Sequence, residues 1–362
     1  MNTIPIIFNE KITPYTAVGC KERGASTGIT AVILNRPGYA RRLFFQDIEK
    51  IGFDNVISVE SCAPHYDIEE LSNRFPFVRF ILPEKEINLG EQINLAACEA
   101  ESPLFYVMRS DMKIIAGGTA KRMAERLIIK SGASDEASRD TSGSASVLNP
   151  EEKNEKKKQG IKEKKCEIKR LCTIPVLMNS NYEILPSIII PLTKKKKMST
   201  HFMEPCAEGE LSLYPFDGIG IYDRQRFILT GGYDATIKNT HWQLMDFGFR
   251  AHLWGEEIAL NLHYKLSCDG ELPPENYSID VNYKRYYLKN LAPVFKSDYA
   301  HLPYYRFPGF FSKSGDDLFS ALDEFKLARK WVKMNKYRYK CDARAVISRF
   351  ETSCEVPRGK GE

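Results

Sequence analysis

The chain has 362 residues, of which 43% are hydrophobic, and a formal net charge of +5 at pH 7. This length is enough for one large α/β domain or two smaller domains, each with its own hydrophobic core. So small a net charge does not indicate a nucleic-acid-binding protein, and we expect at most a mild attraction to phosphates or to an anionic membrane surface.

Cysteine usage and hydropathy point to a soluble protein. Nine cysteines are scattered along the chain without a Cys-x-x-Cys pair, which argues against a disulfide framework or a zinc ribbon. No apolar run approaches the about 20 residues that span a bilayer. Residues 1–10 lack a basic region followed by an apolar core. We therefore expect a cytoplasmic location, with peripheral association at the inner face of the membrane as the alternative.

The first part of the chain alternates between strand and helix patterns. After an N-terminal extension, residues 1–28, strands are predicted at 29–34, 56–59, 77–82 and 103–108. Helices are predicted at 39–51, 68–75, 89–100 and 117–129. Such alternation predicts an α/β fold with a doubly wound, mostly parallel sheet flanked by helices. We assign residues 29–130 to this half.

Residues 131–169 change character. Small and acidic residues come first, followed by a Lys/Glu run at 151–165 with almost no large apolar side chains. Such a segment buries too little apolar surface to offset its ordering entropy, so we predict a disordered or partly helical, lysine-rich insertion. Tethering to nucleic acid or to a membrane is the minor alternative. The second basic run, 194–197, is expected at an exposed hairpin tip.

Structure returns after the insertion. Apolar β-rich runs occur at 176–178 and 188–190, and 213–254 is a second dense region. We assign residues 170–265 to the second half of the same domain and 266–362 to a mixed C-terminal extension. Within the extension, the tyrosine-rich stretch 277–305 is expected to form loops and extended chain, and 316–334 an amphipathic helix.

Polar residues follow three of the predicted strands. Asn35 and Arg36 come after the first strand, Glu60 after the second, and Arg109 and Asp111 after the fourth. Ligands of α/β proteins gather at the carboxyl ends of strands. Asp111 is therefore placed to meet a metal ion or a phosphate.

The order of these motifs resembles the nucleotide-sugar half of a GT-A glycosyltransferase of the large family-two type. That family has a polar turn after its first strand, an acidic residue after the second, an Asn-x-Gly turn before a helix, and an Asp-x-Asp at the end of a later strand. Here the last two motifs read Asn88-Leu89-Gly90 and Arg109-Ser110-Asp111. Further on, Gly231-Gly232-Tyr233-Asp234 and the segment 242–250 resemble the family's acceptor-side loop and helix.

The resemblance implies a GT-A-like fold and a transferase that moves a sugar from a nucleotide-diphosphate donor to a hydroxyl acceptor with inversion. The acceptor would be a glycan, a lipid-linked molecule or a protein, as in glycan or cell-envelope assembly. Asp111 would hold Mg²⁺ or Mn²⁺, Glu60 would bind the base, and Asp246 or Asp234 would deprotonate the acceptor. The remaining substrate contacts would come from Asn35, Arg36, Asn88, Gly90, Arg109, Gly231, Gly232, Trp242, Gln243 and Arg250.

Two departures from the family pattern keep other functions open. Arg109 replaces the first Asp of the Asp-x-Asp, and Gln243-Leu244 replaces a Glu-Asp pair that often includes the catalytic base. The first alternative is therefore a non-catalytic GT-A-like binding or scaffold protein. The second is a nucleotidyltransferase, favoured only if Gly117-Gly118 cradles phosphates.

Several of these residues also have ordinary structural interpretations. Asn88 is a good helix N-cap, and Gly231-Gly232 suits a turn with positive φ. Asp246 and Arg250, four residues apart, can form an ion pair within one helix. Trp242 is more typical of a core or of a pocket wall than of a sugar-stacking platform.

Overall fold

In the computed structural model, the described residues are 13–19, 27–36, 41–64, 66–127, 170–194, 197–269 and 281–355. The predicted insertion at 131–169 lies outside them. Within these ranges, no helix has the length and apolar character needed to cross a membrane.

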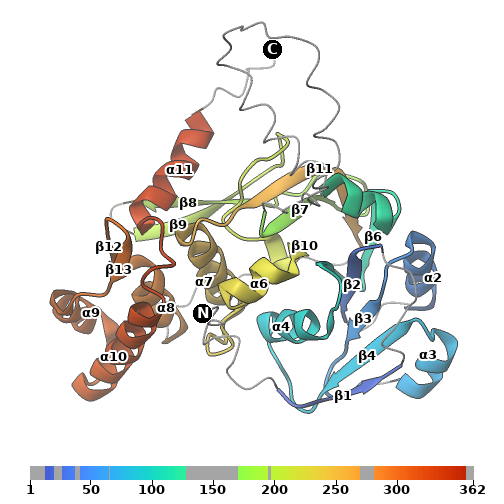
Figure 1. Ribbon diagram of the computed structural model, residues 1–362, viewed down its shortest axis with the longest axis horizontal. Coiled ribbons are helices and arrows are strands. Elements are labelled where there is room, and N and C mark those ends of the chain that lie inside the picture. The colour runs from blue at the N-terminus through green and yellow to red at the C-terminus, as the bar shows by residue number, and fades with distance from the viewer. Residues whose placement is uncertain are drawn as a thin grey trace, which may run out of the picture.

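A nine-stranded sheet forms the centre of the molecule, in the order β1-β4-β3-β2-β5-β10-β7-β11-β6 (Figure 1). Its strands β4, β3, β2 and β5 are parallel neighbours. β10 joins antiparallel to both β5 and β7, and β11 pairs parallel with β7. The strand bounds are β1 Tyr15–Val18, β2 Ile29–Leu34, β3 Val56–Val59, β4 Val78–Pro83, β5 Leu104–Arg109, β6 Met112–Ala116, β7 Cys172–Met178, β10 Gly220–Asp223 and β11 Ile258–Cys268.

Helices cover both faces of the sheet, as its alternating side chains require. In β2, Val32 and Leu34 point into one hydrophobic cluster, whereas Ala31 and Ile33 point into the other. The helix bounds are α2 Arg41–Ile51, α3 Ile68–Arg74, α4 Leu89–Glu99, α6 Arg224–Thr230 and α7 Thr240–Leu253, with a further helix at 120–127. Helices α4, α6 and α7 pack on one face, and α2, α3 and 120–127 on the other. The predicted α/β fold is confirmed.

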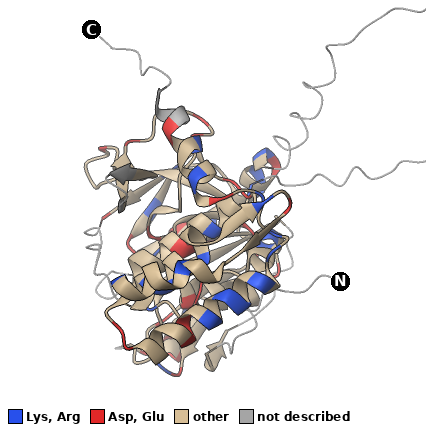
Figure 2. Ribbon diagram, turned by 90° about the vertical axis from the view of Figure 1, so that its left-hand side faces the viewer, with Lys and Arg blue, Asp and Glu red and all other residues tan. Residues whose placement is uncertain are grey.

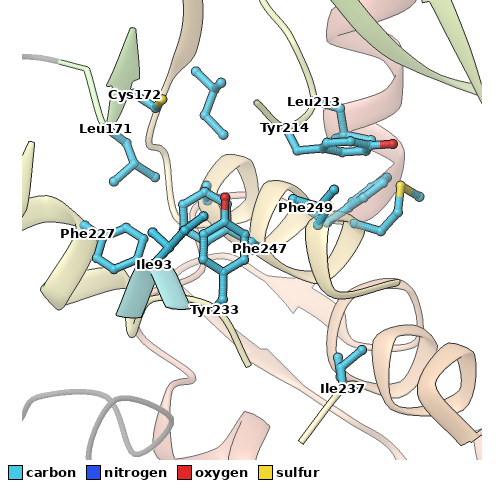
Figure 3. Close-up of a cluster of buried hydrophobic side chains, with 14 of the residues drawn as sticks. Ile93, Leu171, Cys172, Leu213, Tyr214, Phe227, Tyr233, Ile237, Phe247 and Phe249 are labelled. Carbon is cyan, nitrogen blue, oxygen red and sulfur yellow. The ribbon is translucent and has the colours of Figure 1, made fainter. Parts of the chain in front are cut away.

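The face under α4, α6 and α7 has an aromatic centre (Figure 3). The Phe105 ring stacks on Tyr222 with centroids 5.0 Å apart, and Tyr233 stacks on Phe247 at 4.3 Å. Phe227 contacts these rings edge-on or at a tilt. Since the rings come from β5, β10, α6, α7 and the 231–237 loop, this cluster joins the two halves of the chain.

The second half adds a hairpin and a mostly helical C-terminal region. Strands β8 Ile188–Lys194 and β9 Lys197–Met203 pair up to Lys194 and Lys197, so the predicted hairpin at the basic run is confirmed. The C-terminal elements are α8 Val281–Tyr286, a π-helical turn Tyr287–Leu291, β12 Val294–Lys296, β13 Tyr299–His301, α9 Phe307–Ser314, α10 Leu318–Met334 and α11 Ala343–Glu355. The predicted helix at 316–334 is confirmed by α10.

The prediction of loops and extended chain at 277–305 is wrong for 281–291, which is helical. Tyrosine has only a modest helix propensity, so the local pattern gave no helix signal. Tyr286 and Leu288 are fully buried, and Tyr286 stacks against Trp242 with ring centroids 5.6 Å apart. Packing against α7 therefore outweighs the local preference.

Candidate functional site

The strand order reverses between β2 and β5, and the region beyond the carboxyl ends of these two strands is called the β2/β5 crevice below. From β2 the chain continues to β3 and β4 on one side, whereas β5 pairs with β2 on the other side. At such a reversal of strand order a crevice opens beyond the carboxyl ends, and ligands bind there. The Arg36 N–H donates to Ser110 Oγ at 2.8 Å, and the Ser110 N–H donates to the Leu34 carbonyl at 3.0 Å. The segments after β2 and β5 are thus tied together at this point.

Asp111 lies at this crevice between two arginines. Its Oδ2 accepts a hydrogen bond from Arg36 Nη1 at 2.9 Å, and its Oδ1 accepts one from Arg109 Nε at 3.0 Å. Arg109 also donates to Asp217 Oδ2 at 2.6 Å and to Cys268 Sγ at 2.8 Å. Burial disfavours the charge on Arg109, but Asp217 and Asp111 outweigh it and raise the pKa of the guanidinium. The predicted residues Arg36, Arg109 and Asp111 therefore meet in one ion cluster.

Sequence reasoning missed Asp217, which belongs to this cluster. It lies in the turn Phe216–Gly218 with φ of 49°, a left-handed conformation that aspartate tolerates better than most residues. The Asp-Gly pair was an available turn signal, but nothing local indicated that the carboxylate would reach Arg109.

Glu60 is the centre of a second polar chain at the same sheet edge. It is only 3% exposed and accepts hydrogen bonds from Ser58 Oγ at 2.6 Å and from the Tyr66 hydroxyl. Asn35 Nδ2 donates to the same Tyr66 hydroxyl at 2.8 Å. The structure thus brings Asn35 and Glu60 together through Tyr66, a residue that the sequence analysis did not select. The contact of Glu60 with a nucleotide base and the contact of Asn35 with the substrate stay predictions.

The crevice does not have the donor set of a divalent metal site. Both carboxylate oxygens of Asp111 contact guanidinium groups, and Asp217 is paired with Arg109. Within the described ranges, no group of three or more His, Cys, Asp or Glu residues is arranged to hold a metal ion. Coordination by Asp111 would require both of its ion pairs to open. The metal role of Asp111 stays a prediction.

On the acceptor side, Gln243 joins three segments. Its side chain is fully buried; it accepts from the Gly90 N–H and donates to Asn88 Oδ1 and to the Asp234 carbonyl, each at 2.9 Å. Asn88 also caps α4 in a capping box. A Cβ on Gly90 would lie 2.4 Å from Tyr233 Cβ, so only glycine fits there. Gln243 therefore has a structural role here, and an ionised glutamate could not replace it, because it has no N–H to donate to Asn88 and Asp234.

Asp234 and Asp246 are both held by Lys289 from the π-helical turn. Lys289 Nζ lies 2.5 Å from Asp234 Oδ2 and 3.0 Å from Asp246 Oδ1. The Asp246 side chain is fully enclosed and also accepts from Arg250 at 3.0 Å and Asn290 at 2.8 Å. Burial works against ionisation of Asp234, but Lys289 and hydrogen bonds from Lys289 and Thr236 outweigh it and hold its pKa well below the ordinary value.

These contacts describe an ion network that is closed to solvent in this state. The predicted intrahelical pair of Asp246 and Arg250 is present, and Arg250 also donates to the Thr230 and Gly232 carbonyls. Lys289 was missed, because a single lysine in a tyrosine-rich stretch has no local signal. The base role of Asp246 or Asp234 stays a prediction, and it requires Lys289 to move away.

The remaining predicted residues have structural positions. Gly231 ends α6 in the left-handed conformation with φ of 86°, and Gly232 follows with φ of 60°. Trp242 is 7% exposed and packs against Tyr283 and Tyr286. These are the ordinary interpretations considered from sequence.

Two tyrosines connect the donor-side cluster with the acceptor-side loop. The Tyr222 hydroxyl donates to the Gly218 carbonyl at 2.7 Å, next to Asp217, and lies 2.9 Å from the Tyr233 hydroxyl, next to Asp234. Both rings are buried. Buried hydrogen bonds therefore connect the segments that carry Asp217 of the Arg109 cluster and Asp234 of the Lys289 network.

The Gly117-Gly118 loop lies elsewhere. It follows β6, whose first residue Met112 is next to Asp111, so the loop is at the opposite end of that strand from the crevice. A strand of this length separates its two ends by about 15 Å. Nothing in this arrangement favours the nucleotidyltransferase alternative.

No family model matches the chain, and no curated protein matches it. Among solved structures, it is similar to GalNAc-T7, crystallised with UDP, GalNAc and Mn²⁺, with TM-score 0.48 and 10% identity over 85% of this chain and 57% of the other. It is also similar to TarS 1–349 of S. aureus, with TM-score 0.38 and 14% identity over 65% of this chain and 59% of the other. The chain thus spans less than three fifths of each. At TM-scores below 0.5, neither similarity extends to individual residues, so the site is assigned from this chain alone.

Proposed function

We propose that the protein is a glycosyltransferase that moves a sugar from a nucleotide-diphosphate donor to a hydroxyl acceptor. The observation that supports this most directly is the meeting of Arg36, Arg109 and Asp111 at the β2/β5 crevice, beside the Glu60–Tyr66–Asn35 chain. The motif order that resembles the family-two glycosyltransferases supplies the reaction type.

The arginines suit a diphosphate. A guanidinium matches phosphate oxygens with two parallel hydrogen bonds and keeps its charge. In the transfer, the bond from the anomeric carbon to the diphosphate oxygen breaks, and the electron pair leaves with the nucleoside diphosphate. Arg36, which is 29% exposed in its side chain, and Arg109 then stabilise that developing charge. On binding, the phosphates replace Asp111 as their partner.

On the acceptor side, the hydroxyl oxygen attacks the anomeric carbon from the opposite face and its proton passes to a base, so the configuration inverts. Asp234 and Asp246 are the candidate bases. In the structure both form ion pairs with Lys289, and these contacts position the 231–237 loop. A base role predicts that activity falls in Asp234→Asn beyond any change in donor affinity. Because the described donor set does not fit a metal ion, no step is assigned to one.

Donor binding is the first test. Thermal unfolding is followed with UDP-, GDP-, CMP- and dTDP-sugars, each with Mn²⁺, with Mg²⁺ and with EDTA. A ligand at about 100 times its Kd stabilises the folded state by about 2.7 kcal/mol, so we expect one donor class to raise the Tm by about 5 °C. EDTA should leave that rise unchanged. Arg36→Gln should abolish it, and Arg74→Gln, an exposed arginine on α3, is the matched control.

Asp111→Asn distinguishes neutralisation of the diphosphate by the arginines from neutralisation by a metal ion bound to Asp111. If the arginines bind the diphosphate, removing their competing carboxylate keeps or strengthens the Tm shift. If Asp111 holds a metal, the shift depends on Mn²⁺ or Mg²⁺ and disappears in Asp111→Asn. Absence of a shift with every donor would contradict the proposal. Binding without transfer to any acceptor would instead support the non-catalytic alternative.

A further inference from the structure

Exposed apolar side chains are concentrated in one part of the molecule. Of the thirteen large hydrophobic residues that are exposed in the described ranges, eight lie between 304 and 337. They are Tyr304, Tyr305, Phe311, Leu318, Phe319, Leu327, Met334 and Tyr337. Scattered exposed apolar residues need no explanation, but a concentration of them marks an interaction surface.

The same region contains a basic pocket of about 440 Å³ between α10 and β13. Its lining includes five basic side chains, Lys326, Arg329, Lys330, Lys333 and Lys336, together with His301. Figure 2 faces this side of the molecule and shows blue Lys and Arg residues following one another along α10. In Figure 1, α10 and β13 lie at the left of the molecule, whereas β2 lies at the right.

The positive charge of the pocket has little compensation. Residues 325–338 contain six Lys or Arg and no acidic residue. In the described part of the chain, Lys330 and Lys333 have no acidic partner, and Lys326 has only the exposed Asp323 at 3.9 Å. His301 Nδ1 is buried without a hydrogen-bond partner. Clustered like charges raise the local potential and attract an anion.

The pocket and the apolar side chains share one face of α10. Lys326, Lys330 and Lys333 are spaced four and three residues apart, so they lie along a single stripe of the helix. Phe319, which is 78% exposed, precedes Lys326 by seven residues and lies on the same stripe. Leu327 and Met334 flank it. Basic residues beside exposed aromatic and aliphatic ones are typical of helices that lie in a membrane interface.

We propose that this surface, defined by the five basic pocket residues with Phe319, Leu327 and Met334, docks on an anionic phospholipid membrane and receives lipid phosphates in the pocket. A free phosphate would use the cations but would leave the neighbouring apolar side chains in water. A lipid surface uses both, because the headgroups neutralise the lysines while the apolar side chains enter the acyl boundary. This inference does not depend on the glycosyltransferase proposal.

Cosedimentation of the full chain with vesicles tests the proposal. Vesicles of phosphatidylcholine are compared with vesicles that also contain phosphatidylglycerol, and we expect salt-sensitive binding to the second kind only. Each lysine at an anionic surface contributes about fivefold in affinity, so Lys330→Gln/Lys333→Gln should bind about 25-fold more weakly. Lys50→Gln/Lys121→Gln removes the same charge from exposed positions elsewhere and should bind as the unaltered protein does. Phe319→Ser/Leu327→Ser should also weaken binding.

Three results would overturn the proposal. The first is no binding to phosphatidylglycerol vesicles at low salt. The second is an equal change of vesicle affinity in Lys330→Gln/Lys333→Gln and in its control, which would show that another basic segment makes the contact. The third is saturable binding of inorganic pyrophosphate, lost in Lys330→Gln/Lys333→Gln, without vesicle binding, which would make the pocket a site for a soluble phosphate.

Discussion

The four buried charges of the acceptor-side network balance one another. Asp234 and Asp246 each contact Lys289, and Asp246 also contacts Arg250. All four side chains are almost completely shielded from water. In such surroundings a charge is tolerated only with a partner, and removal of one member leaves its partners buried and unpaired. Lys289 is therefore the residue on which the position of both carboxylates depends.

Replacing Lys289 tests this balance. Lys289→Met keeps much of the side-chain volume but leaves two carboxylates with one remaining cation, and we expect the free energy of unfolding to fall by about 3–5 kcal/mol. Urea unfolding measures the loss. Adding Asp234→Asn to Lys289→Met neutralises the carboxylate that has lost its ion pair, whereas Asp246 keeps Arg250, and should restore part of the stability. A Lys289→Met protein as stable as the unaltered chain would show that the network is absent.

Helix α7 is buried on every side, and it carries two histidines into the core. His241 and His252 are 5% and 1% exposed. Burial lowers the pKa of each to about 4. For His252 the hydrogen bond between Nε2 and the Ser212 carbonyl, at 3.0 Å, only partly opposes burial. Both imidazoles are therefore neutral in the folded protein at pH 7.

This burial makes the stability of the protein sensitive to acid. Above the ordinary histidine pKa of about 6.5, both states are neutral and the histidines contribute no pH dependence. Between about pH 6.5 and pH 4, only the unfolded state gains protons, so stability falls by about 1.4 kcal/mol per pH unit for each histidine.

The measurement is urea unfolding at a series of pH values. His252→Gln retains an N–H for the Ser212 carbonyl and should reduce the histidine part of the slope between pH 6.5 and pH 4 by about half. His263→Gln, which replaces a histidine outside the core, is the control, and its slope also contains the contribution of the acidic residues. An unchanged slope in His252→Gln would mean that this histidine is protonated in the folded state.

At the level of the whole molecule, the C-terminal region is part of the main core. Trp331 of α10 stacks on Trp254 at the end of α7 with centroids 6.0 Å apart, and Lys289 Nζ lies 4.7 Å from the Trp331 ring. The Tyr339 hydroxyl donates to the Lys289 carbonyl at 2.9 Å. The region therefore supports the network that holds the 231–237 loop, and α10 has one face in the core and the other exposed.

Two aromatic residues of α10 distinguish these faces. Trp331→Ala should lower the free energy of unfolding by about 3–5 kcal/mol, because it opens a cavity beside Trp254 and Lys289. Phe319→Ala, at an exposed position of the same helix, should change it by less than about 0.5 kcal/mol. Thermal and urea unfolding of the two variants provide the comparison, and equal stabilities would contradict the packing of Trp331 against Trp254 and Lys289.

Local patterns were sufficient for β2 to β5, for the four helices between residues 41 and 127 and for the strand-end residues of the first half. They did not predict β1 and β6, the partly exposed edge strands of the sheet. The bounds of β2 and β3 agree with the predicted strands, because continuous β-branched runs between turn residues have a strong local signal. The meeting of Arg36 with Asp111 followed from chain order, since parallel strands bring their carboxyl ends to one edge.

Long-range packing determined the rest. β10 is a four-residue strand between β5 and β7, and so short a run carries no signal of its neighbours. Asp217 reaches Arg109 across 108 positions of the chain, and Lys289 reaches Asp234 across 55. These pairings depend on how the buried surfaces fit together and on the requirement of each buried charge for a counter-charge. The residues adjacent in sequence do not determine either condition.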